Sequence, residues 1–304
     1  MSNLSIAQRT QAARSTAETS PQCRAAKPFY WEIGDAGKTL AQGRVGLRAP
    51  QSDTLMPIAS SSKWVYAAYV AQLRSGKLTD EDIEFLTFRS GYTRFKRCLS
   101  SDTVNTCVRT LSNGKQDPAT KGKFFYSGGH MQKHAELIGL GDLDNRALAA
   151  ELRKVLGTEI PVAYNQPQLA GGIVASADSY ADFLRKLLAG KLALSGMLGS
   201  HAVCTNPATC EQAASTPIPA RTSWHYSLGH WVEDDPQTGD GAYSSAGLFG
   251  FYPWIDASRS YYGIIARTSL LGTLLSGEGQ RPALESAECG RLIRKAWMSG
   301  APQS

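Results

Sequence analysis

The sequence predicts an α+β fold: an antiparallel β-sheet flanked by N- and C-terminal helices, with a mostly helical region inserted between the strands. Strand-like runs lie near the start and in the last third of the chain, whereas the middle has helical periodicity. The 304 residues are 42% hydrophobic and 19% charged, which excludes a disordered chain and allows a large core. We expect a sheet domain of residues 1–77 and 216–304, a helical domain of residues 78–215, and an active site at their junction.

The first third contains a polar lead, a hairpin and a helix. Residues 1–26 are polar, with a possible short helix. Runs 28–34 and 39–47 are joined by an Asp-x-Gly connector, which is a hairpin signal. Apolar residues at four-residue spacing predict a helix from about Ser60 to Arg74, ended by Gly76.

The remaining elements follow in order. Helices are expected over 145–157 and 176–190, the second capped by Ser176 or Asp178 and closed by Gly190. Three strand-like runs then cover 224–233, 242–256 and 260–269. A final helix starts at Pro282 and ends before Gly300, with an inner face of Leu284, Leu292, Ile293 and Trp297.

The six cysteines form a pattern. Cys98 and Cys107 are close in sequence, as are Cys204 and Cys210, while Cys23 and Cys289 lie near the two ends. Six cysteines allow 15 pairings, so the sequence does not fix the connectivity, although two short loops and one clasp between the termini is the economical solution. A zinc site of His201, Cys204 and Cys210 is a weaker alternative, because no CxxC and no fourth ligand accompany it.

Disulfides would imply an oxidising compartment. The N-terminus lacks the apolar segment of a signal peptide. We therefore expect either a periplasmic or secreted protein whose export signal is absent from this chain, or reduced thiols, and favour the first. No apolar run approaches the roughly 18 residues that span a bilayer.

The first candidate for chemistry is Ser60-Ser61-Ser62-Lys63 at the start of the predicted helix. Residues i and i+3 share a helix face, so the Lys63 amine can lie against the Ser60 hydroxyl and take its proton when partly desolvated. The helix N-terminus adds positive potential where an oxyanion would form. An ordinary N-cap serine is the alternative interpretation. A second Ser-x-x-Lys at Ser112 sits on an Asn-Gly turn, typical of a solvated loop.

Two further segments could contribute. Tyr126, followed by Ser127-Gly128-Gly129, could transfer protons, or be a packed aromatic. Ser245-Ala246-Gly247 lies inside the 242–256 run, where small residues indicate close backbone approach by a substrate, or a bulge.

Other motifs are missing or weak. No GxSxG, HExxH, Walker A or GxGxxG motif occurs, so no cofactor is predicted. His130 and His134 have the i, i+4 spacing of a metal pair, but two polar helix residues near a site are the favoured interpretation, and no metal is predicted.

The order and context of these segments resemble the serine β-lactamase and penicillin-binding protein superfamily, in particular its class C and esterase-like branch. The resemblance runs from about residue 28 to the end. It is carried by MPIASSSKWVYAAYVAQLRSGKLTDED (56–82), FLTFRSGY (85–92), GKFFYSGG (122–129), LAGGIVASADSYADFL (169–184), YSLGHWVE and GAYSSAGLFGFYPWID (226–256).

The resemblance implies a β-lactamase/transpeptidase-like fold and roles for individual residues. Ser60 would be the acylated nucleophile, Lys63 its proton partner, and Tyr126 the general base and acid. The backbone N–H groups of Ser60 and Leu248 would form the oxyanion hole. The implied reaction is acyl transfer through an acyl-enzyme.

Two departures from the superfamily pattern restrict the substrate. Gly128 replaces the usual asparagine, and Ser245-Ala246-Gly247 replaces a Lys-Thr-Gly or a histidine in first place, so the cation for a substrate carboxylate is missing. These positions, with His130 as a possible polar replacement, favour an esterase or amidase on a small ester or amide. The alternatives are a β-lactamase or D-alanyl-D-alanine peptidase, and a catalytically degenerate module that binds an anionic envelope polymer.

The net charge of +6 is unevenly distributed. Residues 85–135 hold nine basic residues against two acidic ones, a net of +7, so the rest of the chain has a net charge of −1. We expect this segment to form one wall of the cleft and to attract an anionic substrate or surface. Nucleic-acid binding is not expected, because the aromatics Tyr92 and Phe95 beside these basic residues suit the surface of a helical domain equally well.

Overall fold

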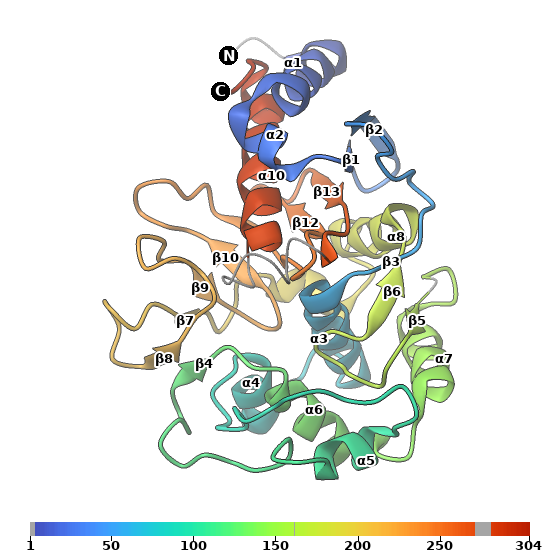
Figure 1. Ribbon diagram of the computed structural model, residues 1–304, viewed down its shortest axis with the longest axis vertical. Helices are drawn as coiled ribbons and strands as arrows, with labels where there is room; N and C mark the ends of the chain where they lie inside the picture. Colours follow the sequence, from blue (N-terminus) through green and yellow to red (C-terminus); the bar gives the residue numbers. More distant parts are fainter. Residues whose placement is uncertain (1–3, 161, 271–280) are drawn as a thin grey trace.

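The computed structural model describes residues 4–160, 162–270 and 281–304, and it confirms the predicted α+β architecture (Figure 1). Within these residues, one eight-stranded sheet has the strand order β2-β1-β13-β12-β11-β10-β9-β7, with every neighbouring pair antiparallel. Its strands are β1 (Phe29–Gly34), β2 (Thr39–Val45), β7 (Val203–Cys204), β9 (His225–Tyr226), β10 (Trp231–Glu233), β11 (Ala242–Ser244), β12 (Tyr252–Ile255) and β13 (Tyr262–Ala266).

The terminal helices cover one face of this sheet. The predicted short helix of the polar lead is two helices, α1 (Ile6–Thr19) and α2 (Pro21–Ala26), and both pack against α10 (Arg281–Ser299) (Figure 1). A capping box between Ser5 and Gln8 begins α1. The predicted inner face of α10 is confirmed most fully at Ile293 and Trp297, which are buried.

The hairpin signal is confirmed. β1 pairs with β2, and Asp35 Oδ1 accepts hydrogen bonds from the N–H groups of Gly37 (2.8 Å) and Lys38 (2.9 Å) in the connecting turn.

Two of the predicted long strands are wrong in detail, because each is a hairpin. The 224–233 run reverses between β9 and β10 at Gly229, whose φ of 70° suits glycine. The 242–256 run reverses between β11 and β12, where the Gly247 N–H bonds the Phe251 carbonyl at 2.7 Å. Only brief polar or glycine interruptions occur among the apolar residues at both turns, as at Ser227, Gly229 and Ser245, so hydrophobicity alone shows no clear break.

Helix α8 (Ala177–Leu188) packs against β13 of the sheet, and the other helices of the middle of the chain lie beyond it (Figure 1). The predicted helices are confirmed as α3 (Ser62–Leu73), α7 (Asn145–Leu156) and α8, the last capped by the Ser176 side chain. The remaining elements are α4 (Asp80–Leu86), α5 (Val104–Arg109), α6 (Gly129–Ala135), a π-helix (Glu136–Leu140), 3₁₀ helices (Ala59–Ser61, Ala193–Met197), the small sheet β3-β6-β5 (Met56–Pro57, Ile173–Ala175, Ala163–Tyr164) and the pair β4-β8 (Phe124–Phe125, Ala213–Ser215).

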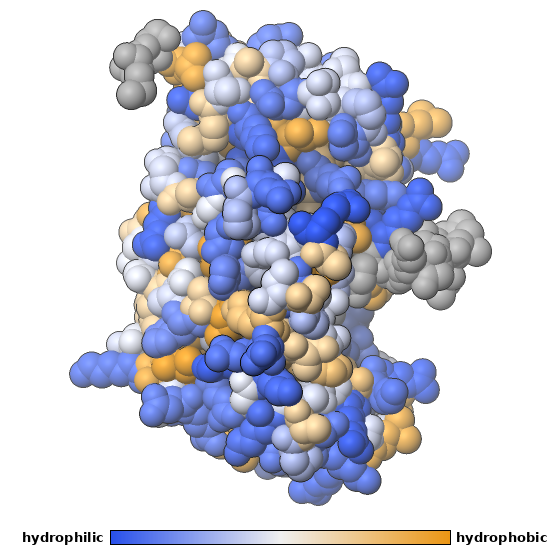
Figure 2. Space-filling view, turned by 90° about the vertical axis from the view of Figure 1, so that its left-hand side faces the viewer, coloured by the Kyte–Doolittle hydropathy of each residue, from blue (hydrophilic) through white to orange (hydrophobic). Residues whose placement is uncertain are grey.

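The division into two domains stays a prediction. Two elements from residues 78–215 lie against the large sheet: α8 packs on β13, and β7 pairs with β9. Figure 2 shows the side that carries β7–β10, where hydrophobic side chains gather at mid-height within a largely hydrophilic surface.

The economical cysteine pairing is confirmed. Cys23–Cys289 joins α2 to α10, and the two local disulfides are Cys98–Cys107 and Cys204–Cys210. Among the described residues, no group of three or more potential ligands could hold a metal ion, and no helix is long and apolar enough to cross a membrane.

Candidate active site

Ser60 lies in the tight turn that leads from β3 into α3. The preceding residue, Ala59, has a φ of 46°, in the left-handed region that costs a residue with a Cβ about 1–2 kcal/mol. The Ser60 side chain remains partly exposed, whereas Ser61 and Ser62 are buried. Such strain is retained only where the surroundings enforce it, and it is frequent at functional sites.

Three elements enforce this turn. On one side, the Ile58 N–H bonds the Ile173 carbonyl at 3.1 Å, and the Ile173 N–H bonds Ser62 Oγ at 3.2 Å. From α8, the Tyr180 hydroxyl bonds the Ser61 carbonyl at 2.9 Å. Ser61 and Ser62 thus hold the turn in place, whereas Ser60 is the partly exposed serine of the triplet.

The 245–251 loop forms the third side. Ser245 Oγ donates to the Ser60 carbonyl at 3.0 Å, and Ser61 Oγ donates to the Ser245 carbonyl at 2.6 Å. A Cβ at Gly247 would lie 2.2 Å from the Ile58 carbonyl oxygen, a distance that atoms cannot adopt, so only glycine fits there. The small residues predicted to allow close approach by a substrate therefore also seat this loop on the nucleophile turn.

Lys63 lies one helical turn beyond Ser60, as the spacing predicts. Its Nζ donates to Ser60 Oγ at 2.8 Å and to the Ala170 carbonyl at 2.8 Å. The side chain is only 4% exposed, and burial lowers the pKa of Lys63 to about 7, because desolvation disfavours the ammonium. The amine is therefore partly neutral near neutral pH.

Tyr126 lies beside Lys63 in space, although the two residues are far apart in the sequence. Lys63 Nζ is 4.9 Å from the centroid of the Tyr126 ring, and that ring stacks on Trp231 with centroids 5.4 Å apart. Burial raises the pKa of Tyr126 to about 12, although hydrogen bonding with the side chains of Ser60 and Trp231 opposes the rise. The phenol is thus protonated at neutral pH and close to Ser60.

The comparisons with known proteins concern the fold. No family model and no curated protein matches the sequence. Solved structures do match the fold: one is a β-lactamase-like protein from Bacteroides dorei, at 17% identity and a TM-score of 0.62 over 89% of this chain and 95% of that chain. EstCE1, a hydrolase with promiscuous acyltransferase activity, matches at 14% identity and a TM-score of 0.61, over 92% and 98%. A D-stereospecific amidohydrolase from Streptomyces matches at 14% identity and a TM-score of 0.58, over 86% and 94%.

The chain has the fold of the serine β-lactamase and penicillin-binding protein superfamily. Within this β-lactamase-like fold, Ser60 from the 3₁₀ helix before α3, Lys63 from α3 and Tyr126 from the segment between β4 and α6 lie close together.

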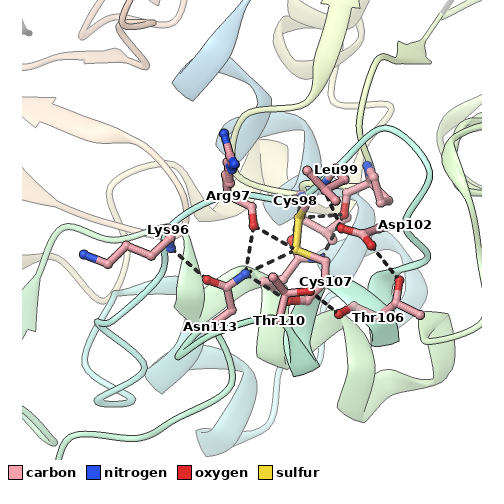
Figure 3. The surroundings of a disulfide bond; sticks show 12 residues. Lys96, Arg97, Cys98, Leu99, Asp102, Thr106, Cys107, Thr110 and Asn113 are labelled. Carbon is pink, nitrogen blue, oxygen red and sulfur yellow. Dashed lines mark hydrogen bonds between the residues drawn. A yellow bond between two sulfur atoms is a disulfide. The ribbon is translucent and has the colours of Figure 1, made fainter.

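The position of Gly128 explains one departure from the superfamily pattern. A Cβ there would lie 3.2 Å from the Phe95 ring and 3.3 Å from Ala170 Cβ, so an asparagine would require Phe95 to move. Figure 3 shows how the neighbouring segment is held: the Cys98–Cys107 disulfide and Asn113 fix it, and the Lys96 N–H donates to Asn113 Oδ1 at 2.8 Å. Phe95 thus belongs to a firmly held segment of the β-lactamase-like fold.

The two histidines of the HMQKH segment are buried and fully engaged. His130 contacts Ser90 Oγ at 2.7 Å through Nδ1 and the Phe125 carbonyl at 2.9 Å through Nε2. Burial lowers the pKa of His130 to about 3, so the ring is neutral. His134 lies between the Tyr66 hydroxyl and Asp82 Oδ1, at 2.9 and 3.0 Å. Both have the environment of structural residues, and the structure does not place His130 as a substrate contact.

Sequence reasoning missed three neighbours of the site. The Ala170 carbonyl orients Lys63, Trp231 supports Tyr126, and Phe95 fills the space beside Gly128. Only Ala170 had a signal, because it adjoins the Gly171-Gly172 turn. A backbone carbonyl and two aromatic residues otherwise look like any other part of a core.

Proposed function

We propose that this protein is a serine hydrolase that cleaves an ester or amide through an acyl-enzyme on Ser60. The observation that carries the proposal is the buried Lys63 amine, 2.8 Å from Ser60 Oγ and with its pKa lowered to about 7. A surface lysine beside an N-cap serine would keep its charge and could not accept a proton.

In the acylation step, Ser60 Oγ bonds to the substrate carbonyl carbon while its proton passes to the neutral Lys63 amine. The bond to the leaving oxygen or nitrogen then breaks, and the Tyr126 hydroxyl donates its proton to that atom. The proton that Lys63 took from Ser60 then passes to the Tyr126 oxygen and restores the phenol. The net result is the transfer of one proton from Ser60 to the departing alcohol or amine. Because the pKa of Tyr126 is raised to about 12, this residue starts as the acid and Lys63 as the base.

The developing oxyanion would be stabilised by the N–H groups of Ser60 and Leu248. Leu248 lies in the loop that is seated on the Ser60 turn, and its N–H has no acceptor among the described residues. In the deacylation step, water attacks the acyl carbon, gives one proton through the same groups to Ser60 Oγ, and releases the acid.

The test is acylation itself. A fluorophosphonate or a chromogenic acyl ester should add its mass to the wild-type protein, and peptide mapping should place that mass on Ser60. Ser60→Ala should take up no label, and Ser112→Ala, in the solvated second Ser-x-x-Lys, should label like the wild type. Full activity of Ser60→Ala would refute the proposal.

The alternatives use the same site differently. Ser245 supplies no cation for a β-lactam carboxylate, and its hydroxyl is engaged by the Ser60 carbonyl. We therefore expect nitrocefin turnover to be slow compared with ester cleavage. Polymer binding without any acyl-enzyme would favour the degenerate binding module. The three disulfides support the expected export to the periplasm or the exterior.

A further inference from the structure

A groove with an apolar inner part leads away from Tyr126 along the start of α10. Its inner part is narrow, with a volume of about 30 Å³, and borders on Tyr126 and Ala246. Its outer part is wider, with a volume of about 240 Å³. Both parts share four lining residues: Ile218, Trp224, Leu284 and Ala287. The two parts of the groove therefore adjoin each other beside the site.

The groove begins on the leaving-group side of the site. Tyr126 is the acid that would protonate the departing atom, so whatever is attached to that atom lies next to Tyr126. The groove starts at this residue and at Ala246, the middle residue of the 245–247 segment. A leaving group that extends beyond its first atoms thus enters the groove.

The described residues that line the inner part of the groove are uncharged. In the outer part, Arg221 lies 3.8 Å from Glu288, and Arg291 lies 3.6 Å from Glu233. Both arginines lie near carboxylates, but Arg291 Nε has no hydrogen-bond partner among the described residues and Glu233 also pairs with Arg294, so only the inner part of the groove is free of charge.

We propose that this groove is the leaving-group subsite and that it takes an uncharged alkyl chain, so that the preferred substrates are esters of simple apolar alcohols. The proposal rests on the proposed acyl-enzyme function and names its substrate class. The narrow inner part suits a slender chain better than a ring, and an anionic group would lose its hydration there without a partner.

The test compares two acetate esters that differ only at the far end of the leaving group. Hexyl acetate and 6-acetoxyhexanoate have alcohols of nearly equal acidity and give the same acetyl-enzyme. In a mixture of the two, the ratio of the released alcohols reports the ratio of kcat/KM directly. We expect hexyl acetate to be preferred by at least about tenfold, because its terminal methyl group gains free energy on burial, whereas the carboxylate of 6-acetoxyhexanoate would lose its hydration.

Substitutions in the groove test whether the preference for hexyl acetate arises there. Leu284→Arg should reduce it several-fold, because it adds a cation and removes apolar surface, while deacylation of the acetyl-enzyme stays unchanged. Leu137→Arg is the matched control, since Leu137 is 50% exposed and lies outside the groove, and it should keep the wild-type ratio.

The outcomes separate the two proposals. Failure of both esters to acetylate Ser60 would overturn the proposed function. Acetylation of Ser60 by both esters at equal rates, or an unchanged ratio in Leu284→Arg, would overturn the leaving-group subsite and leave the proposed function intact.

Discussion

Replacement of Lys63 by methionine should abolish acylation and yet stabilise the protein near neutral pH. The ordinary pKa of a lysine is 10.5, and burial lowers that of Lys63 to about 7. At pH 7 and below, folding must therefore remove a proton or bury a charge, which destabilises the folded state. At about 1.4 kcal/mol for each factor of ten, this cost reaches about 5 kcal/mol.

Methionine removes this cost but leaves the Ala170 carbonyl without its donor. An unsatisfied buried carbonyl costs about 1–3 kcal/mol. The difference predicts that Lys63→Met raises the free energy of unfolding by about 2–4 kcal/mol at pH 7. Acylation of Ser60 should fall by at least about a thousandfold, because the base is gone.

The stability difference between the wild type and Lys63→Met should depend on pH. Between pH 7 and 10.5 the unfolded chain binds more protons than the folded one, so the stability of the wild type should rise with pH across this window. Above about pH 10.5 the lysine is neutral in both states, and only the lost hydrogen bonds remain. The variant should there be less stable than the wild type.

Urea unfolding at several pH values between 7 and 10.5, with the disulfides intact, measures this difference. Lys77→Met is the matched control, since Lys77 is exposed and its replacement should shift stability little at any pH. If Lys63→Met is less stable than the wild type by the same amount at every pH, Lys63 is charged in the folded protein and cannot be the base.

Three further predictions follow from the site. Tyr126→Phe keeps the stacking on Trp231 but removes the acid, so the rate of acylation by alkyl esters should fall by about 10²–10⁴-fold. The loss should be smaller for p-nitrophenyl esters, because their leaving group needs no proton. Equal losses for both kinds of ester would contradict the role of Tyr126. Gly247→Ala should lose activity and melt at a lower temperature, because its Cβ has no room against the nucleophile turn, and thermal melts with a label assay check both effects. Charge reversal at Arg94, Lys96 and Arg97 should weaken cleavage of anionic esters at low salt, and unchanged kinetics would leave these residues as a solvated surface.

Local sequence patterns predicted many elements of the fold. The 28–34 and 39–47 runs were identifiable as a hairpin because the aromatic and aliphatic runs and the Asp-x-Gly turn between them are local signals. The helices at 145–157 and 176–190 were likewise identifiable from their apolar periodicity and end signals. The turns within 224–233 and 242–256 were missed, because only brief polar or glycine interruptions occur in the apolar runs there and the reversal depends on tertiary packing.

The candidate site likewise has features that were predictable from local sequence and features that were not. The i, i+3 spacing of Ser60 and Lys63 follows from helix geometry, so their contact was predictable from the sequence. The sequence could not show that the Lys63 amine is buried against the Ala170 carbonyl, since that contact joins residues 107 positions apart. It is this burial that lowers the pKa of Lys63 and gives the lysine its chemistry.

The sequence by itself determined the α+β class, the helical periodicities, the hairpin at the N-terminal end and the residues able to act as nucleophile and base, because each depends on neighbours a few positions away. Only the tertiary structure decided which cysteines pair, how Tyr126 meets Ser60 and Lys63, and where an apolar groove opens beside them. These features arise from the exclusion of water and the close approach of distant segments, and neither is encoded in local spacing.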